Sequence, residues 1–129
     1  MSTTQPASAV GPYARGAGRF AMIVGFIIVL WWAWLLLTDD VPDLYTRPVA
    51  MWFHIAGEVT TAAILIVAGY GMLAATAWAR RLYLVATGML LLVVIHAVAW
   101  YGSHGDFPMV VLFCILAVLG VFFALRAEE

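Results

Sequence analysis

The stretch FAMIVGFIIVLWWAWLLL, residues 20–37, decides the fold class, because it is long, apolar and free of charge. A helix needs about 20 predominantly apolar residues to cross the hydrocarbon core of a bilayer. The stretch exceeds the apolar core of a signal peptide, about 7–15 residues, and it ends in Leu-Leu-Leu-Thr-Asp-Asp rather than in small residues. We therefore predict a retained first transmembrane helix. Its three tryptophans, at 31, 32 and 34, are typical of a membrane interface.

Three further apolar stretches follow, at about residues 51–73, 82–101 and 107–125. Of the 129 residues, 66% are hydrophobic and 10% are charged, and the mean hydropathy is +1.04. Soluble domains average about 45–50% apolar and about 25% charged residues. A soluble fold would leave too much apolar surface in water, so the chain belongs in a lipid bilayer. We predict an all-α integral membrane protein that folds as an antiparallel bundle of four transmembrane helices.

The segments outside the four spans are short. We expect residues 1–18 to be a disordered cytoplasmic leader, residues 19–126 to be the transmembrane domain, and residues 127–129 to be a cytoplasmic tail. The stretch TDDVPDLYTRP, residues 38–48, combines aspartates and prolines and predicts a polar loop.

The arginines predict the orientation of the helices. One side of the predicted membrane has Arg15, Arg19, Arg80, Arg81 and Arg126. The opposite loops contain Arg47 and four aspartates. Because cytoplasmic loops are enriched in basic residues, we predict that both termini are cytoplasmic, in a bacterial-type inner membrane. The arginines form no basic face and the net charge is −1, so we exclude nucleic acid as a partner.

Three ionisable side chains interrupt the apolar stretches: His54 and Glu58 in the second span, and His96 in the third. An ionisable group in hydrocarbon is energetically expensive, so it indicates a functional site. His54 and Glu58 are four residues apart and therefore share a helix face. With a rise of about 1.5 Å per residue, all three lie roughly 4–10 Å below the outer helix ends. Because the second and third spans should be antiparallel neighbours, we expect the three side chains to converge.

Four hypotheses for this cluster stay open at this point. The first is a structural hydrogen-bond network that fixes the register of two helices. The second is a b-type haem between His54 and His96, with Arg47 at a propionate. The third is a divalent metal ion held by His54, Glu58, His96 and His104. The fourth is proton transport centred on Glu58, or quinone traffic in which a histidine bonds a quinone carbonyl.

No catalytic signature accompanies the cluster. The His-x-x-x-Glu spacing of His54 and Glu58 differs from the His-Glu-x-x-His motif of zinc hydrolases, so we assign no catalytic residue. We predict a small accessory or scaffold-type membrane subunit, not an enzyme on its own, that associates with other subunits or with itself. The alternatives are a haem- or metal-binding electron-transfer or quinone-interacting subunit, and a proton-coupled carrier.

The stretches HIAGEVTTAAILIVAGYGML, residues 54–73, and AWARRLYLVATGMLLLVVI, residues 77–95, carry a resemblance. A second helix with a polar start, a Trp-x-Arg turn and a Gly-Met-Leu third helix resemble small four-helix membrane proteins of the DoxX-like kind and related bacterial families. The resemblance covers about residues 13–126. It implies a four-helix membrane fold, and fold analogy alone assigns no activity.

Overall fold

The computed structural model describes residues 11–127, and this part of the chain is helical with no strand. Its helices are α1 (Pro12–Leu37), α2 (Asp43–Thr46), α3 (Pro48–Leu73), α4 (Ala79–Ser103) and α5 (Phe107–Arg126). All except α2 are long and apolar enough to cross a membrane. The predicted all-α class with four long apolar helices is therefore confirmed.

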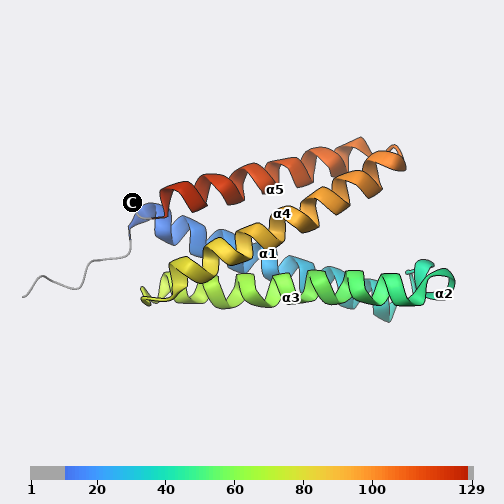
Figure 1. Cartoon of the computed structure of the whole chain (residues 1–129), viewed down its shortest axis with the longest axis horizontal. Coiled ribbons are helices and arrows are strands. Elements are labelled where there is room, and N and C mark those ends of the chain that lie inside the picture. Colours follow the sequence, from blue (N-terminus) through green and yellow to red (C-terminus); the bar gives the residue numbers. More distant parts are fainter. Residues whose placement is uncertain (1–10, 128–129) are drawn as a thin grey trace, which may run out of the picture.

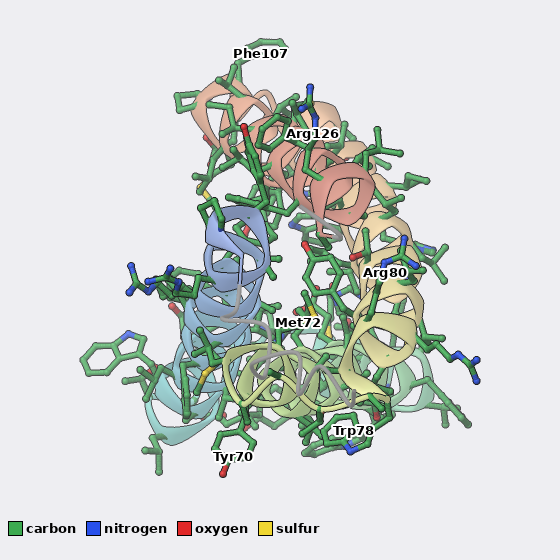
Figure 2. All side chains as sticks on the ribbon, turned by 90° about the vertical axis from the view of Figure 1, so that its left-hand side faces the viewer. Tyr70, Met72, Trp78, Arg80, Phe107 and Arg126 are labelled. Atoms are coloured by element: carbon green, nitrogen blue, oxygen red, sulfur yellow. The ribbon has the colours of Figure 1, made fainter. Side chains whose placement is uncertain are left out.

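The four long helices form a ring in which each helix packs against two others (Figures 1 and 2). Around this ring the order is α1, α3, α4 and α5, with α5 closing onto α1. Successive helices run in opposite directions. Both ends of the described chain therefore lie with the α3–α4 connection at one end of the bundle, which we call the terminal end. The opposite end, which contains α2 and the α4–α5 connection, is called the α2 end.

Helix α1 begins at Pro12, earlier than the predicted start near residue 20. Residues 12–18 are therefore helical rather than part of a disordered leader, whereas residues 1–10 lie outside the described residues. Arg15 of this segment and the following Arg19 are exposed, while Ala17 and Gly18 are buried against the bundle. The exposed arginines made this segment look like a polar leader, although its opposite face packs against the bundle. At the opposite terminus, Ala127 of the predicted tail is buried.

Helices α1 and α3 approach each other most closely, because glycines line their contact. A Cβ atom on Gly69 would lie 2.6 Å from the carbonyl oxygen of Gly18, and one on Gly18 would lie 2.9 Å from that of Gly69. Farther along, a Cβ atom on Gly25 would lie 2.8 Å from the carbonyl oxygen of Ala62. Such distances leave no room for a side chain, as in the small-residue contacts typical of membrane helices.

A substitution at this contact should separate the two helices. We expect Gly69→Ala to lower the free energy of unfolding by about 1–3 kcal/mol, because overpacking forces the backbones apart. Gly88→Ala is the matched control, since a Cβ atom there meets nothing within 4 Å. Both variants would be compared with the wild type by denaturant titration in one detergent. Equal stability of the two variants would contradict the close α1–α3 contact.

The connection between α1 and α3 is more ordered than the predicted polar loop. It contains α2, and its Val41 is buried against Trp32 of α1 and Ile55 of α3. The hydroxyl of Tyr45 donates a hydrogen bond to Asp39 Oδ1 at 2.6 Å, and this bond raises the pKa of the Tyr45 phenol above its ordinary value. The loop therefore covers the α2 end of the α1–α3 pair.

The main apolar core lies towards the terminal end. It contains the buried residues Ala17, Ala21, Val24, Leu65, Ala68, Met72, Ala79, Tyr83, Ala86, Leu90, Val94 and Ala127. Towards the α2 end, α4 and α5 lean away from α1 and α3 (Figure 1). The second buried cluster, at that end, joins only α1, α3 and the loop between them. The two helix pairs therefore pack together at the terminal end and separate towards the α2 end.

Candidate functional site

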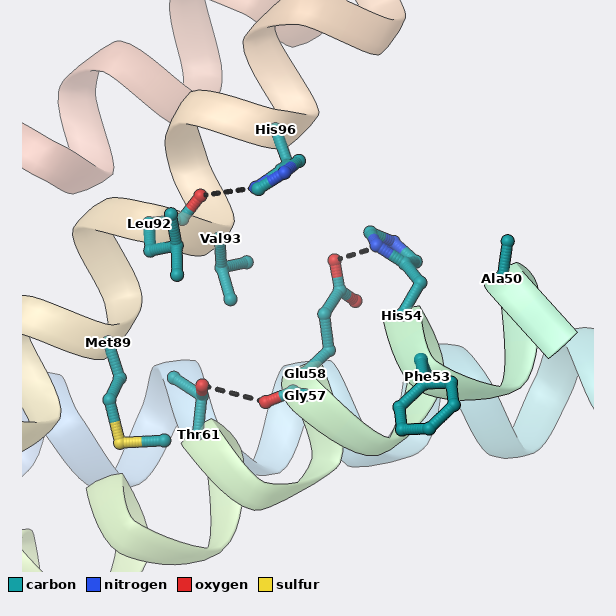
Figure 3. A pocket seen from close by; sticks show the side chains of 10 residues that line it. All are labelled: Ala50, Phe53, His54, Gly57, Glu58, Thr61, Met89, Leu92, Val93 and His96. Carbon is teal, nitrogen blue, oxygen red and sulfur yellow. Dashed lines mark hydrogen bonds and ion pairs between the residues drawn. The ribbon is translucent and has the colours of Figure 1, made fainter.

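A cavity of about 490 Å³, open to the surface of the bundle, lies between α3 and α4, where α4 leans away from α3 (Figure 3). Its lining residues Phe53 and Leu92 are 76% and 58% exposed. Its volume is within the range of about 300–1,000 Å³ that is usual for ligand sites. The lining residues are mostly apolar and include all three ionisable residues found in the predicted spans. They are Ala50, Phe53, His54, Gly57, Glu58, Thr61, Met89, Leu92, Val93 and His96.

Glu58 connects α3 to α1 at the edge of this cavity. The indole Nε1–H of Trp32 donates a hydrogen bond to Glu58 Oε2. On the other side of the carboxylate, His54 Nε2 lies 3.3 Å from Glu58 Oε1. The Trp32 and His54 rings contact each other edge to face, with their centroids 5.8 Å apart. The side chain of Glu58 is therefore held at both oxygens, and it is only 13% exposed.

Trp32 is the residue of this candidate site that the sequence analysis missed, because all three tryptophans of this helix were assigned to the membrane interface. Trp31 and Trp34 are 48% and 64% exposed, as that interpretation expects, but Trp32 is only 7% exposed. One signal was present in the sequence. Gly18, Gly25 and Trp32 follow one another at intervals of seven residues, a spacing that keeps residues on one face of a packed helix. That face is the one that contacts α3.

His96 reaches the same cavity from α4. Its Nδ1 lies 3.1 Å from the carbonyl oxygen of Leu92, one turn earlier in the helix. Because a carbonyl oxygen only accepts, this bond requires the tautomer with the proton on Nδ1, in which Nε2 is an acceptor. Among the described residues, no hydrogen bond or ion pair joins His96 to His54 or Glu58. The three side chains thus share a cavity without forming one bonded cluster, because α4 leans away from α3 here.

Two other residues assigned from the sequence do not line the cavity. Arg47 is exposed at the start of α3. His104 is exposed at the end of α4, where its Nδ1 lies 2.7 Å from the carbonyl oxygen of Trp100. Within residues 11–127, no three His, Cys, Asp or Glu side chains gather closely enough to hold a metal ion. The predicted metal site of His54, Glu58, His96 and His104 is therefore not assembled.

The haem hypothesis stays a prediction. One nitrogen of each proposed axial ligand is engaged within its own helix, His54 Nε2 with Glu58 and His96 Nδ1 with Leu92, and the other nitrogen of each ring is left for a ligand. Arg47, proposed for a propionate, is absent from the residues that line the cavity.

The polar residues lie deeper along their helices than the sequence predicted. Helix α3 begins at Pro48 rather than at Met51. Glu58 is therefore ten residues from the helix start, about 15 Å along the axis, instead of about 10 Å. His54 and His96 lie at roughly 9 Å and 10 Å from the α2 ends of their helices. Glu58 thus lies well inside the apolar length of α3.

The comparisons with known proteins bear on the family and not on the activity. The family described as "Domain of unknown function (DUF8058)" matches residues 13–127. The chain belongs to this family. No curated protein and no solved structure gives a significant match. The matched residues of the DUF8058 domain include every residue that lines the cavity. Nothing in these comparisons tests the resemblance to DoxX-like proteins, which stays a prediction.

The hydrogen bond between Trp32 and Glu58 can be tested by its effect on stability. We expect Trp32→Phe to lower the free energy of unfolding by about 1.5–3 kcal/mol, because a buried carboxylate loses a donor. The neighbouring exposed residue provides the control, and Trp31→Phe should change this energy by less than about 0.5 kcal/mol. In a Glu58→Gln background, the difference between the two variants should shrink, since the charged acceptor is gone. Denaturant titrations that show the same loss for both tryptophans would contradict the assignment.

Proposed function

We propose that this chain is a multi-pass membrane protein that binds a small amphiphilic molecule in the α3–α4 cavity and acts as an accessory subunit. The observation that carries this proposal is the cavity itself, in which Glu58, His54 and His96 are set among apolar side chains. A concave apolar site with a few polar groups is the usual form of a small-molecule site. A carboxylate kept within an apolar helix also favours a functional role.

A purely structural role for Glu58 explains only part of the site. The bonds to Trp32 and His54 stabilise the contact of α1 with α3. They do not explain why space is left between α3 and α4. Gly57 borders that space, and a Cβ atom on it would meet nothing within 4 Å. Packing between helices therefore does not require glycine at this position, whereas it does require Gly18 and Gly69.

The distribution of polar groups favours binding over proton transport across the bundle. Between Glu58 and the terminal end, the described bundle buries the hydroxyl groups of Thr61, Thr87 and Tyr83. The two threonines each bond a carbonyl oxygen of their own helix, and Tyr83 donates to the carbonyl oxygen of Gly120 on α5. A relay across a membrane usually uses a chain of carboxylates and imidazoles. The proton-coupled carrier centred on Glu58 stays a prediction with less support than the binding site.

We also propose that the four helices span a bacterial-type inner membrane with both termini in the cytoplasm. Five of the six arginines lie in α1, α4 or α5 near the terminal end, and all four aspartates lie at the α2 end. This asymmetry follows the positive-inside rule. The cavity then lies nearer the outer face, and its ligand comes from the outer leaflet or the periplasm.

The orientation can be tested with single cysteines placed in two exposed connections. In a Cys114→Ala background, Thr46→Cys reports the α2 end and Ala77→Cys reports the terminal end. We expect a membrane-impermeant maleimide to label Thr46→Cys in intact cells, and to label Ala77→Cys only after the membrane is permeabilised. Labelling of Ala77→Cys in intact cells would contradict the proposed orientation.

Filling the cavity tests the proposed binding. Leucine at residue 57 should occupy the space without a clash, so Gly57→Leu should remain folded and lose ligand binding. Gly88→Leu is the control. A Cβ atom added at residue 88 would also meet nothing within 4 Å, and Gly88 does not line the cavity. Binding of 4-phenylbutanol, a small amphiphile, would be measured by saturation-transfer NMR on the full chain in detergent. We expect binding by the wild type and Gly88→Leu, and its loss in Gly57→Leu. Equal binding by all three would contradict the proposal.

A further inference from the structure

Apart from His54, whose Nε2 lies 3.3 Å from Glu58 Oε1, the polar side chains that border the cavity present acceptors to it. Glu58 offers carboxylate oxygens, which only accept when ionised. The Thr61 hydroxyl donates its proton to the carbonyl oxygen of Gly57 at 2.8 Å, so its oxygen is left with acceptor capacity. His96 likewise uses its Nδ1–H on Leu92 and keeps Nε2 as an acceptor. The donors of Thr61 and His96 are therefore already used within their own helices.

The lining residues of the cavity contain one carboxylate, that of Glu58, and neither lysine nor arginine. His54 is the lining side chain that is already set against this carboxylate, at 3.3 Å from Oε1. The chain has no lysine, and Arg47, the arginine at this end of the bundle, does not line the cavity. A charge held in apolar surroundings is stabilised when it is paired and hydrogen-bonded. Each oxygen of Glu58 can accept a further hydrogen bond beside those from Trp32 and His54. A ligand that brings a positive charge and N–H donors would therefore add to this pairing, whereas an anion would be repelled.

From this chemistry we propose that the ligand is an organic ammonium ion, a primary or secondary amine with a short apolar body. Its N–H groups donate to Glu58 and to His96 Nε2 across the cavity, while its apolar body contacts Phe53, Met89 and Leu92. The inference rests on the proposed function and specifies the ligand of the same site. It disfavours a quinone, because the carbonyl oxygens of a quinone can only accept hydrogen bonds. The donors of Thr61 and His96 are already engaged within their own helices.

Three probes of similar size separate the ligand classes. 4-Phenylbutylamine is a cation with N–H donors at neutral pH, because an alkyl ammonium has a pKa of about 10.4. 4-Phenylbutanol is neutral, and 4-phenyl-2-butanone only accepts. Since charge-assisted hydrogen bonds are about twice as strong as neutral ones, we expect the full chain in detergent to bind the amine about tenfold more tightly than the alcohol. The ketone should bind most weakly.

Two variants locate the source of this preference. Glu58→Gln should abolish the preference for the amine over the alcohol. Because Glu58 also contacts α1, His96→Leu provides a second test that leaves the Trp32–Glu58 hydrogen bond in place, and it should weaken the preference as well. Asp40→Asn removes an exposed carboxylate at the same end of the bundle and should change nothing.

The outcomes distinguish this inference from the proposed function. If the alcohol or the ketone binds as tightly as the amine, or if Glu58→Gln keeps the preference, the ammonium inference is overturned and the cavity remains a ligand site. If none of the three probes binds the wild type more tightly than Gly57→Leu, both proposals fail.

The same ammonium chemistry can come from a free amine or from the head group of phosphatidylethanolamine. Bilayer nanodiscs distinguish these sources. The quaternary head group of phosphatidylcholine has no N–H donor, so it serves as the matched lipid. Weaker binding of 4-phenylbutylamine in phosphatidylethanolamine than in phosphatidylcholine would identify the lipid as the occupant, and equal binding would identify a free amine.

Discussion

The close contact of α1 with α3 is the constraint on which the rest of the structure depends. Where Gly18 meets Gly69, each glycine's carbonyl oxygen occupies the space that a side chain on the other would need. The same face of α1 brings Trp32 to Glu58, so the polar bridge follows from the apolar packing. The loop with α2 covers this pair at one end, and α4 and α5 pack against it mainly at the other. The cavity between α3 and α4 is the space that this uneven packing leaves.

Glu58 gives this space its chemical character. Two donors, from Trp32 and His54, hold its carboxylate on the side of α1 and α3, and the cavity lies on the side of α4. The imidazole of His96 faces the cavity with an acceptor because its other nitrogen bonds its own helix. An apolar cavity bordered by acceptors and one carboxylate is suited to a small cationic donor. A structural bridge and a binding site are thus compatible roles of one carboxylate.

The long helices and the residues that border the cavity could be predicted from the sequence, but the contacts between helices could not. A long run of apolar residues without charge fixes a helix by composition alone, and a buried ionisable residue within it is conspicuous. The sequence does not indicate which face of such a helix turns inward, because apolar residues are present on every face. Trp32 therefore looked the same as Trp31. The separation of His96 from Glu58 depends on how α4 leans, and that is set by side chains packed near the terminal end.

The measurement that addresses the site most directly is the ¹H–¹⁵N NMR spectrum of the indole groups. The chain has six tryptophans, and the resonance missing from Trp32→Phe identifies the indole of Trp32. Because this N–H donates to a carboxylate, we expect its resonance to shift in Glu58→Gln while those of the exposed tryptophans stay in place. A Trp32 resonance that is unchanged in Glu58→Gln would contradict the bridge between α1 and α3 and the site built on it.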